Sequence, residues 1–298
     1  MALSKIEIIV PGQMTTIQDG GRHGYRSFGL PQSGFMDRLS ARQANLLVSN
    51  AADHTLIEMI QVGITAKFLT SATIALTGAD MGAQLNGHPI GRFKSLTVKK
   101  GDLIQLERAT SNMISYLAIA GHWVIPEVLG STSTFLRAKI GGICGRPLQK
   151  GDLIEIKNNT IEKPRLIPEP DIRSFHYGRK IRLLKSVESS DEHMIWLQQH
   201  SFEVTNNWDR MGIRLSGPPP TLTAQGILTS AVTVGTIQLP PDGQPIIVMV
   251  DGQTTGGYPR IATVIQADLP YLAQQPPGTT LQFEQVSNQQ ALNLLQWH

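Results

Sequence analysis

Short apolar stretches recur along the chain and are separated by glycine, proline and small polar residues. The clearest stretches lie at 6–10, 73–76, 96–98, 116–119, 181–184, 246–250 and 261–265. Runs of this length that are rich in β-branched residues and bounded by turn residues are typical of strands. With 28 glycines and 18 prolines in the chain, this rhythm predicts a mainly β fold of the barrel or sandwich kind.

Helical periodicity is confined to a few short segments. The strongest runs from about Arg38 to Ser49, with Asp37 or Ser40 as its N-cap and Asn50 as its C-terminal stop. Shorter helices are predicted at 192–199, 269–274 and 291–296. The sequence therefore places a few short helices around a β framework.

The composition changes between Lys157 and Lys180, where proline and polar residues replace the apolar runs. Such a segment is typical of a linker. It separates an N-terminal domain at 1–160 from a C-terminal domain at 175–298, and both lengths are ordinary for a domain.

A small element occurs twice and is echoed a third time. Lys100-Gly101-Asp102 and Lys150-Gly151-Asp152 each precede an alternating run, and Pro277-Gly278-Thr279 does so more weakly. Glycine supplies the positive φ of a tight turn, and a short polar residue after it starts the next strand. We therefore expect Asp102 and Asp152 to serve turns and not acid–base chemistry.

The charge balance and the cysteine count exclude several classes of protein. The 26 basic and 23 acidic residues are spread along the chain without a basic block, so nucleic acid is not an expected partner. No apolar run is long enough for a signal peptide or a membrane span. The single cysteine, Cys144, cannot form an internal disulfide and has no neighbouring base to activate its thiol. We therefore expect a cytoplasmic protein with no membrane contact.

Several common catalytic patterns are missing. The sequence contains neither a phosphate-binding loop, nor a Gly-x-Gly-x-x-Gly turn after a strand, nor a Gly-x-Ser-x-Gly elbow. The eight histidines show no ligand spacing, so we expect no metal site. A nucleotide would have to bind through another kind of loop or on another protein.

Two polar segments bracketed by glycine remain, one in each half of the chain. The first, at 15–37, carries Asp19, Arg22 and Ser33 among five glycines that permit close backbone approach. From the residues alone, ligand binding and a local Asp19–Arg22 ion pair are equally good explanations, while Asp37 is explained by capping. The second, at 235–260, has turns with more Gln, Asp, Thr, Tyr and Arg than a simple hairpin requires.

Several motifs, in order along nearly the whole chain, resemble one family. Besides the polar run at 235–260, they are Thr16-Ile17-Gln18-Asp19, Gly21-Arg22-x-Gly24-Tyr25, Ser33-Gly34-x-Met36-Asp37, Thr77-Gly78-Ala79-Asp80, Tyr116–Gly121, Val128–Ser131 and Asp209-Arg210-Met211-Gly212. They resemble the biotin-dependent carboxyltransferase-like family, also called allophanate hydrolase subunit 2-like, whose members include KipA and the C subunit of bacterial 5-oxoprolinase. Motifs of this number in one order are far more specific than a lone glycine motif.

The resemblance implies two tandem cyclophilin-like β-barrel domains and a multi-subunit enzyme. It implies the C subunit of an ATP-dependent 5-oxoprolinase, which opens 5-oxoproline to L-glutamate together with A and B subunits, of which the B subunit is KipI-like. We expect no activity from this chain alone. Two alternatives stay open: a carboxyltransferase component of a biotin-dependent urea or amide carboxylase, and a KipA-like regulator that binds a KipI-like kinase inhibitor.

Both enzymatic alternatives activate a planar amide, whose carbonyl oxygen must be polarised by preorganised donors. With the resemblance, this requirement makes five residues catalytic candidates: Asp19, Arg22, Asp251, Gln253 and Tyr258. The candidate substrate-binding residues are Ser33, Arg210, Gln238, Gln244, Thr254, Gly256, Gly257 and Arg260. Asp242 is interpreted as a turn residue, and a local Asp209–Arg210 pair stays open. We expect the loops around Arg22 and Gln253 to line a shared cleft.

Some positions depart from the family pattern. Thr132, Ser230 and Gly252 stand where members commonly carry arginine, glutamate and arginine, and Lys185-Ser186-Val187 replaces a Pro-Gly-Pro segment. The three lost charges leave the identity of the substrate open.

Overall fold

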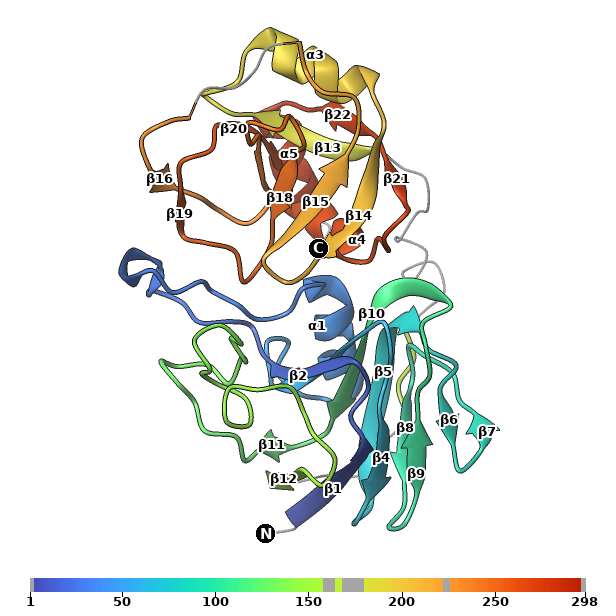
Figure 1. Cartoon of the computed structure of the whole chain (residues 1–298). Coiled ribbons are helices and arrows are strands. Elements are labelled where there is room, and N and C mark those ends of the chain that lie inside the picture. The colour runs from blue at the N-terminus through green and yellow to red at the C-terminus, as the bar shows by residue number, and fades with distance from the viewer. Residues whose placement is uncertain (1–2, 158–163, 168–179, 222–225, 296–298) are drawn as a thin grey trace. The chain divides into compact units, whose positions relative to one another are not determined.

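The structure is a computed structural model that describes residues 3–157, 164–167, 180–221 and 226–295 (Figure 1). It is mainly β, as predicted, and divides into two compact units. Unit 1 comprises Met1–His23 and Ser33–Ser174, and unit 2 comprises Gly24–Gln32 and Phe175–His298. The N-terminal range predicted from the sequence, 1–160, includes the segment 24–32 that the structure groups with unit 2. The linker predicted at 157–180 lies mostly outside the described residues.

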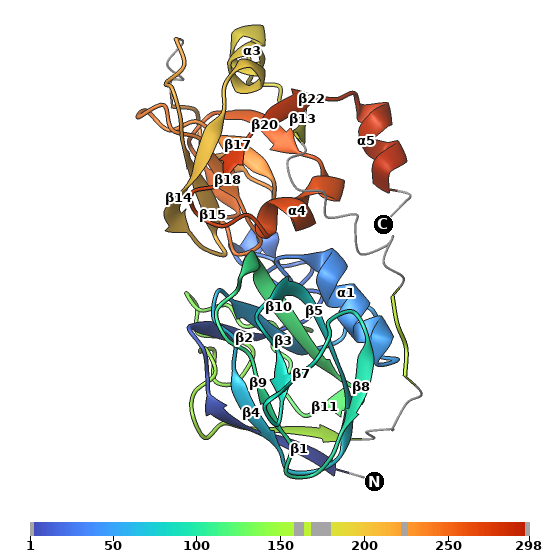
Figure 2. The ribbon, with the colours of Figure 1, turned by 90° about the vertical axis from the view of Figure 1, so that its right-hand side faces the viewer.

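Over its described residues, unit 1 contains two antiparallel sheets and one α-helix. The first sheet contains β1 (Leu3–Val10), β4 (Thr65–Phe68), β6 (Gln84–Leu85), β7 (His88–Pro89), β9 (Leu103–Gln105), β11 (His122–Trp123) and β12 (Leu153–Lys157), in the order β11-β12-β1-β4-β9-β6-β7. The second contains β2 (Met14–Gln18), β3 (Leu56–Ile60), β5 (Ala72–Asp80), β8 (Ser95–Val98) and β10 (Ser111–Ile119), in the order β2-β3-β10-β5-β8. The helix α1 (Arg38–Leu47) lies against β5 and β10 (Figure 2).

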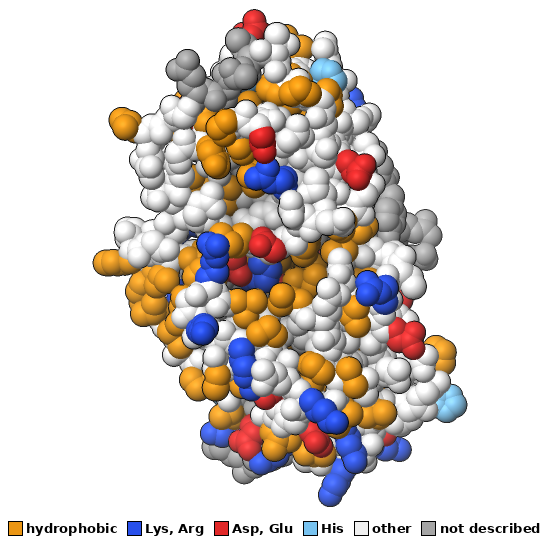
Figure 3. Space-filling view, viewed as in Figure 1, with side chains coloured by type: hydrophobic (Ala, Val, Ile, Leu, Met, Phe, Trp, Pro, Cys, Tyr) orange, Lys and Arg blue, Asp and Glu red, His pale blue; other side chains and the backbone are white. Residues whose placement is uncertain are grey.

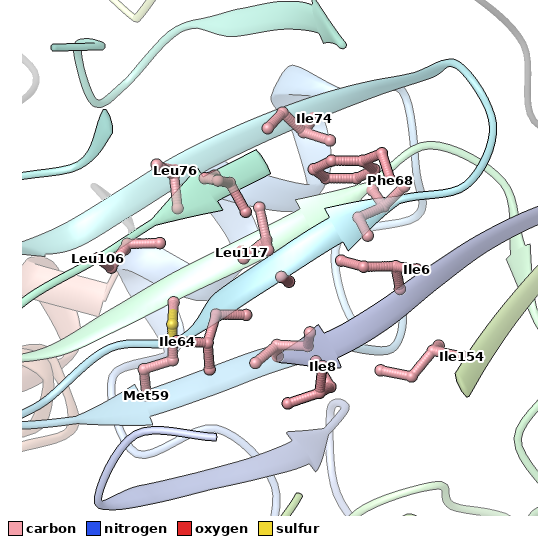
Figure 4. Close-up of a cluster of buried hydrophobic side chains, with 14 of the residues drawn as sticks. Ile6, Ile8, Met59, Ile64, Phe68, Ile74, Leu76, Leu106, Leu117 and Ile154 are labelled. Carbon is pink, nitrogen blue, oxygen red and sulfur yellow. The ribbon is translucent and has the colours of Figure 1, made fainter. Parts of the chain in front are cut away.

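Both sheets of unit 1 contribute side chains to one apolar core (Figure 4). Ile6 and Ile8 project from β1, Leu76 from β5 and Leu117 from β10, and all four are buried. Burying a side chain of this size stabilises a fold by about 1.5–3 kcal/mol. The short apolar runs that predicted these strands therefore supply the side chains of the core.

The first turn of α1 confirms one of the two predicted N-caps. The backbone N–H of Ser40 donates to Asp37 Oδ1 at 3.0 Å, so Asp37 is the capping residue. The helix ends at Leu47, earlier than the predicted stop at Asn50, because Ser49 adopts a left-handed conformation with φ of 60°. The N–H of Asn50 closes this end by donating to Asn45 O at 3.0 Å.

The three repeated turns have the geometry that their sequences predict. Gly101, Gly151 and Gly278 have φ of 94°, 88° and 86°. In each turn, the glycine N–H donates to the backbone carbonyl oxygen of one residue in a neighbouring strand. The N–H of that strand residue donates back to the carbonyl oxygen of the residue that follows the glycine. These bonds are 2.7 to 2.9 Å long. The strand residues that pair with Gly101, Gly151 and Gly278 are Phe68, Ile8 and Val204, respectively.

The two predicted turn aspartates cap these turns with their side chains. Asp102 Oδ2 accepts from the backbone N–H of Lys99 at 2.7 Å, and Asp152 Oδ2 accepts from that of Gln149 at 2.8 Å. Their structural interpretation is confirmed.

Asp152 also forms a two-point ion pair with Arg146, at 2.8 Å and 2.7 Å. The hydrogen bond from Arg146 holds the pKa of Asp152 below its ordinary value. A carboxyl whose pKa is lower in the folded state adds stability above its unfolded pKa, and this is lost as pH falls through the folded pKa. We therefore expect stability to fall more steeply below about pH 4 in the wild-type chain than in an Asp152→Asn variant. Urea unfolding at a series of pH values measures both slopes, and equal slopes would contradict this prediction.

Unit 2 is built around one large sheet. It contains β13 (Ile181–Lys185), β14 (Phe202–Trp208), β15 (Gly212–Ser216), β17 (Thr236–Gln238), β18 (Ile246–Val248), β20 (Arg260–Val264), β21 (Thr280–Leu281) and β22 (Phe283–Gln285), in the order β21-β14-β15-β18-β17-β20-β13-β22. Two short strands, β16 (Ser230–Ala231) and β19 (Thr255–Gly256), pair separately. The helical segments are α3 (Asp191–Gln199), α4 (Leu269–Ala273), α5 (Asn288–Leu295), η1 (Arg26–Phe28) and η2 (Gln266–Asp268). The predicted short helices are thus confirmed, with α5 starting earlier than expected.

Acidic and basic side chains lie near one another on the face shown in Figure 3. Among the described residues, Arg42–Asp53 and Lys5–Glu155 are exposed ion pairs. Among the helices that the structure describes, none has the length and apolar character needed to cross a bilayer. Within the same described residues, no group of three or more His, Cys, Asp or Glu side chains is placed to hold a metal ion.

Candidate functional site

One row of isoleucines defines the buried face of the large sheet in unit 2. Ile213 of β15 lies opposite Ile247 of β18, which lies opposite Ile237 of β17. All three side chains are fully buried. Because side chains alternate between the faces of a strand, the residues between these isoleucines project from the opposite face.

The opposite face of the same strands carries a pocket of about 200 Å³. Gly212 is paired with Val248, Arg214 with Ile246, and Ile246 also with Gln238. All five residues line the pocket. The register therefore places an apolar floor, Ile246 and Val248, between an amide side chain and a guanidinium.

Three predicted site residues meet in this pocket: Gln238, Gln253 and Tyr258. Gln253 Nε2 donates to Gln238 Oε1 at 2.8 Å, which orients both amides. Gln238 is only 1% exposed, and its Nε2 has no hydrogen-bond partner among the described residues. A buried donor left in this state costs about 1–3 kcal/mol, which an acceptor bound in the pocket would recover.

Glycine at position 256 makes room for the Gln238 amide. A Cβ atom added to Gly256 would lie 2.7 Å from Gln238 Nε2. Any side chain there would displace the amide or the strand β19. Gly256 was predicted to bind substrate. The close approach explains this glycine through the position of Gln238, and its substrate-binding role stays a prediction.

Arg210 and Asp251 form a buried ion pair beside the pocket. The guanidinium donates to both carboxylate oxygens, at 2.8 Å and 3.1 Å, and the two side chains are 6% and 5% exposed. The backbone N–H of Asp251 also donates to Arg210 O at 2.8 Å. These contacts join the turn before β15 to the loop that carries Gln253, so the pair positions the pocket wall.

Asp209 lies on the exposed rim of the pocket. Its Oδ1 accepts from the backbone N–H groups of Met211 at 2.7 Å and Gly212 at 3.0 Å. Asp209 thus caps the turn into β15. Arg210 pairs with Asp251 and not with Asp209, the local partner that the sequence had left open.

The remaining candidates of unit 2 hold loops in place. Gln244 accepts from Gly217 N at 2.9 Å and donates to Gly217 O at 3.2 Å. Thr254 is buried, and its carbonyl oxygen accepts from Val232 N at 2.9 Å. The carbonyl oxygen of Gly257 accepts from Ile227 N at 3.0 Å.

Arg260 pairs with Glu188 through two guanidinium nitrogens, and Arg260 N donates to Glu188 Oε2 at 2.8 Å. The hydrogen bond from Arg260 lowers the pKa of Glu188. A substrate-binding role for Arg260 stays a prediction.

The two catalytic candidates of unit 1 meet on one segment, residues 128–134. Asp19 Oδ1 accepts from Ser131 Oγ at 2.7 Å and from Ser133 Oγ at 2.5 Å, and Oδ2 accepts from Thr132 N at 2.7 Å and Thr132 Oγ1 at 3.1 Å. The departure from the family pattern at position 132 thus contributes a hydroxyl to the Asp19 carboxylate.

Arg22 is buried and reaches the same segment. Its Nε donates to Val128 O and its Nη2 to Ser133 O, both at 2.9 Å. Ser33, the third candidate of this unit, is buried with φ of 56°. These contacts explain Asp19 and Arg22 as supports of 128–134, and their predicted catalytic roles stay predictions.

The sequence model for the carboxyltransferase domain, subdomains A and B, matches residues 28–285. The chain belongs to this family. It is 40% identical over 295 residues to the 5-oxoprolinase C subunit of Haemophilus influenzae, and 37% identical over 297 residues to the 5-oxoprolinase C subunit of Escherichia coli. The alignments cover 97% and 98% of this chain and 94% of each relative.

A solved structure from the family's larger enzymes has a similar fold. The urea amidolyase of K. lactis superposes with a TM-score of 0.90 at 29% identity, over 98% of this chain and 19% of that chain. This chain therefore corresponds to about one fifth of that enzyme.

Arg214 and Ile246 line the pocket but were not predicted as site residues. Ile246 lies in a stretch that was predicted only as a strand, and Arg214 lies in β15, which the apolar pattern did not predict. Position parity was the available signal: Arg214 follows Gly212 of the family motif by two residues, so the two must share a face.

Proposed function

We propose that this chain is the C subunit of an ATP-dependent 5-oxoprolinase complex that opens 5-oxoproline to L-glutamate. The observation that carries the proposal is its 40% and 37% identity to two proteins named as the C subunit of 5-oxoprolinase. The match covers 94% of each of these relatives, and this supports equivalence to that subunit.

The pocket residues support a role in lactam activation. A lactam carbonyl is a weak electrophile, and donors aimed at its oxygen stabilise the charge that develops there during ring opening. Gln238, Gln253 and Tyr258, which line the pocket, are the candidate donors. In this proposal the Arg210–Asp251 pair holds the Gln253 loop, while Asp19 and Arg22 maintain the segment 128–134.

The proposal assigns ATP to a different polypeptide of the complex. A pocket of about 200 Å³ is smaller than the 300–1,000 Å³ that is usual for drug-sized ligands, and a nucleoside triphosphate is larger still. The partners in the proposal are the A and B subunits, of which the B subunit is KipI-like. The complex would work in the reducing cytoplasm, which suits a chain whose single cysteine cannot form an internal disulfide.

Reconstitution tests the proposal. We expect glutamate from 5-oxoproline, with ATP hydrolysis, when this chain is mixed with purified A and B subunits, and none when this chain is left out. Measurement of glutamate and of released phosphate in the same samples shows whether the two are coupled. A fully assembled complex that forms no glutamate would overturn the proposal, and tight binding to the B subunit without turnover would favour a regulator.

The second candidate is a carboxyltransferase component of a biotin-dependent carboxylase. The superposition on urea amidolyase, with a TM-score of 0.90, favours it. It predicts activity that depends on bicarbonate and a biotinylated carrier and that is abolished by avidin. The same purified chain can be assayed in both systems, and activity without biotin excludes this candidate.

A further inference from the structure

We infer that the pocket of unit 2 selects a cis amide that carries a carboxylate: Gln238 and Gln253 bind the amide edge, and Arg214 binds the carboxylate. The choice of 5-oxoproline as the ligand rests on the proposed function. The assignment of each ligand group to a pocket residue rests on the contacts and the strand register.

The hydrogen bond between the two glutamine amides leaves a donor group on one of them and an acceptor group on the other for a ligand. Gln253 Nε2 donates to Gln238 Oε1, which leaves Gln238 Nε2 as a donor and Gln253 Oε1 as an acceptor. If both amides are turned over, the donor and the acceptor exchange places between the two residues. In either orientation the pair matches a ligand that offers a carbonyl oxygen and an N–H together.

A five-membered lactam presents these two groups on the same edge. Its ring forces the amide to be cis, so the C=O and the N–H lie side by side. Open-chain secondary amides are trans and place the two groups on opposite sides. Contact with both glutamines therefore favours the lactam over a linear peptide or an N-acyl amino acid.

The strand register gives the pocket a span that suits the rest of the ligand. Gln238, Ile246 and Arg214 lie in one row across three adjacent strands. Strands are spaced by about 4.8 Å, so the Cα atoms of Gln238 and Arg214 are separated by roughly 10 Å. Long side chains from both ends can hold a small ring between them, with its CH₂ groups over Ile246 and Val248.

Arg214 has capacity for a second anion. One of its nitrogens, Nη1, donates to Asp242 Oδ2 at 2.8 Å, and the two side chains are 35% and 52% exposed. An ion pair this exposed contributes little, and a guanidinium carries five N–H donors. The nearby Asp209 carboxylate is offset by two backbone N–H groups. A ligand carboxylate can therefore bind Arg214 beside Asp242 or in its place.

The test compares two ligands that differ in the carboxylate: L-5-oxoproline and 2-pyrrolidone. Calorimetry on the full chain should show that Arg214→Gln weakens binding of 5-oxoproline about tenfold or more and leaves 2-pyrrolidone unchanged. Gln253→Leu should weaken both ligands. Asp242→Asn should tighten 5-oxoproline only, because the competing anion is removed. Arg42→Gln, which removes a similarly exposed guanidinium from unit 1, is the control and should change neither.

The reconstituted complex separates failure of this inference from failure of the proposed function. If the wild-type complex turns over 5-oxoproline but Arg214→Gln and Gln253→Leu leave its KM unchanged, the pocket assignment is overturned and the function stands. If the chain binds as expected and no complex turns over, the function fails and the assignment stands. If the wild-type chain binds neither ligand and the complex is inactive, both fail. Urea midpoints of the variants show whether each one is folded.

Discussion

Replacement of Asp251 by alanine should lower the free energy of unfolding by about 3–5 kcal/mol. The carboxylate is 5% exposed and accepts two hydrogen bonds from Arg210, which is itself 6% exposed. Its removal takes away both of these charge-assisted hydrogen bonds and a nearby opposite charge, so desolvation of the buried guanidinium is offset less well. The Gln253 loop, which begins just after Asp251, should loosen at the same time.

Urea unfolding followed by fluorescence measures this loss. Asp242→Ala is the control in the same unit, because the Arg214–Asp242 pair is exposed and should contribute no more than about 1 kcal/mol. The double variant Arg210→Met/Asp251→Leu removes both charges and should recover much of the stability. If Asp251→Ala and Asp242→Ala lowered the free energy of unfolding equally, burial of the Arg210–Asp251 pair would make no difference to stability and the prediction would be wrong.

Replacement of Asp19 by alanine should destabilise unit 1 by about 3 kcal/mol or more. The carboxylate accepts from the backbone N–H groups of Gly21 and Thr132 and from three hydroxyl groups of the segment 131–133. Hydrogen bonds to a charged group contribute about 1.5–3 kcal/mol each and are not additive. The substitution therefore leaves several donors without an acceptor in one step.

Amide hydrogen exchange locates this effect. Exchange at Thr132 and Gly21 should accelerate in Asp19→Ala more than in Asp53→Ala, which removes an exposed carboxylate paired with Arg42. Asp19→Asn keeps one acceptor oxygen, so exchange at Thr132 and Gly21 in this variant should be intermediate between the rates in Asp19→Ala and Asp53→Ala. If the Thr132 amide exchanged equally in all three variants, Asp19 would not anchor the segment.

The fold was predictable because it depends on local patterns. The alternation at Ile6 and Ile8 and the cap at Asp37 are readable from neighbouring residues, and the glycines of the repeated turns adopt the positive φ that their sequence implies. The grouping of residues 24–32 with unit 2 was not predictable, because no feature of the local sequence shows which unit such a segment belongs to.

The candidate site was predictable only in part. The excess polarity of the turns at 235–260 identified Gln238, Gln253 and Tyr258, which line the pocket. The position of Arg214 in the pocket depends on the register of β15 against β18, and this register cannot be read from the apolar pattern of either strand. Asp19 and Arg22 resemble ligand-binding residues in sequence because their partners lie more than 100 positions away.

The grouping of Gly24–Gln32 with unit 2 limits how the gene can be divided for expression. A fragment cloned from position 175 onward would lack this segment, and Val232 O would lose the guanidinium of Arg26 that donates to it. A fragment that ends before 175 would carry the same nine residues without their surroundings. Co-expression of both fragments, or a circular permutant that keeps 24–32 with the C-terminal half, should give more soluble material than either fragment alone.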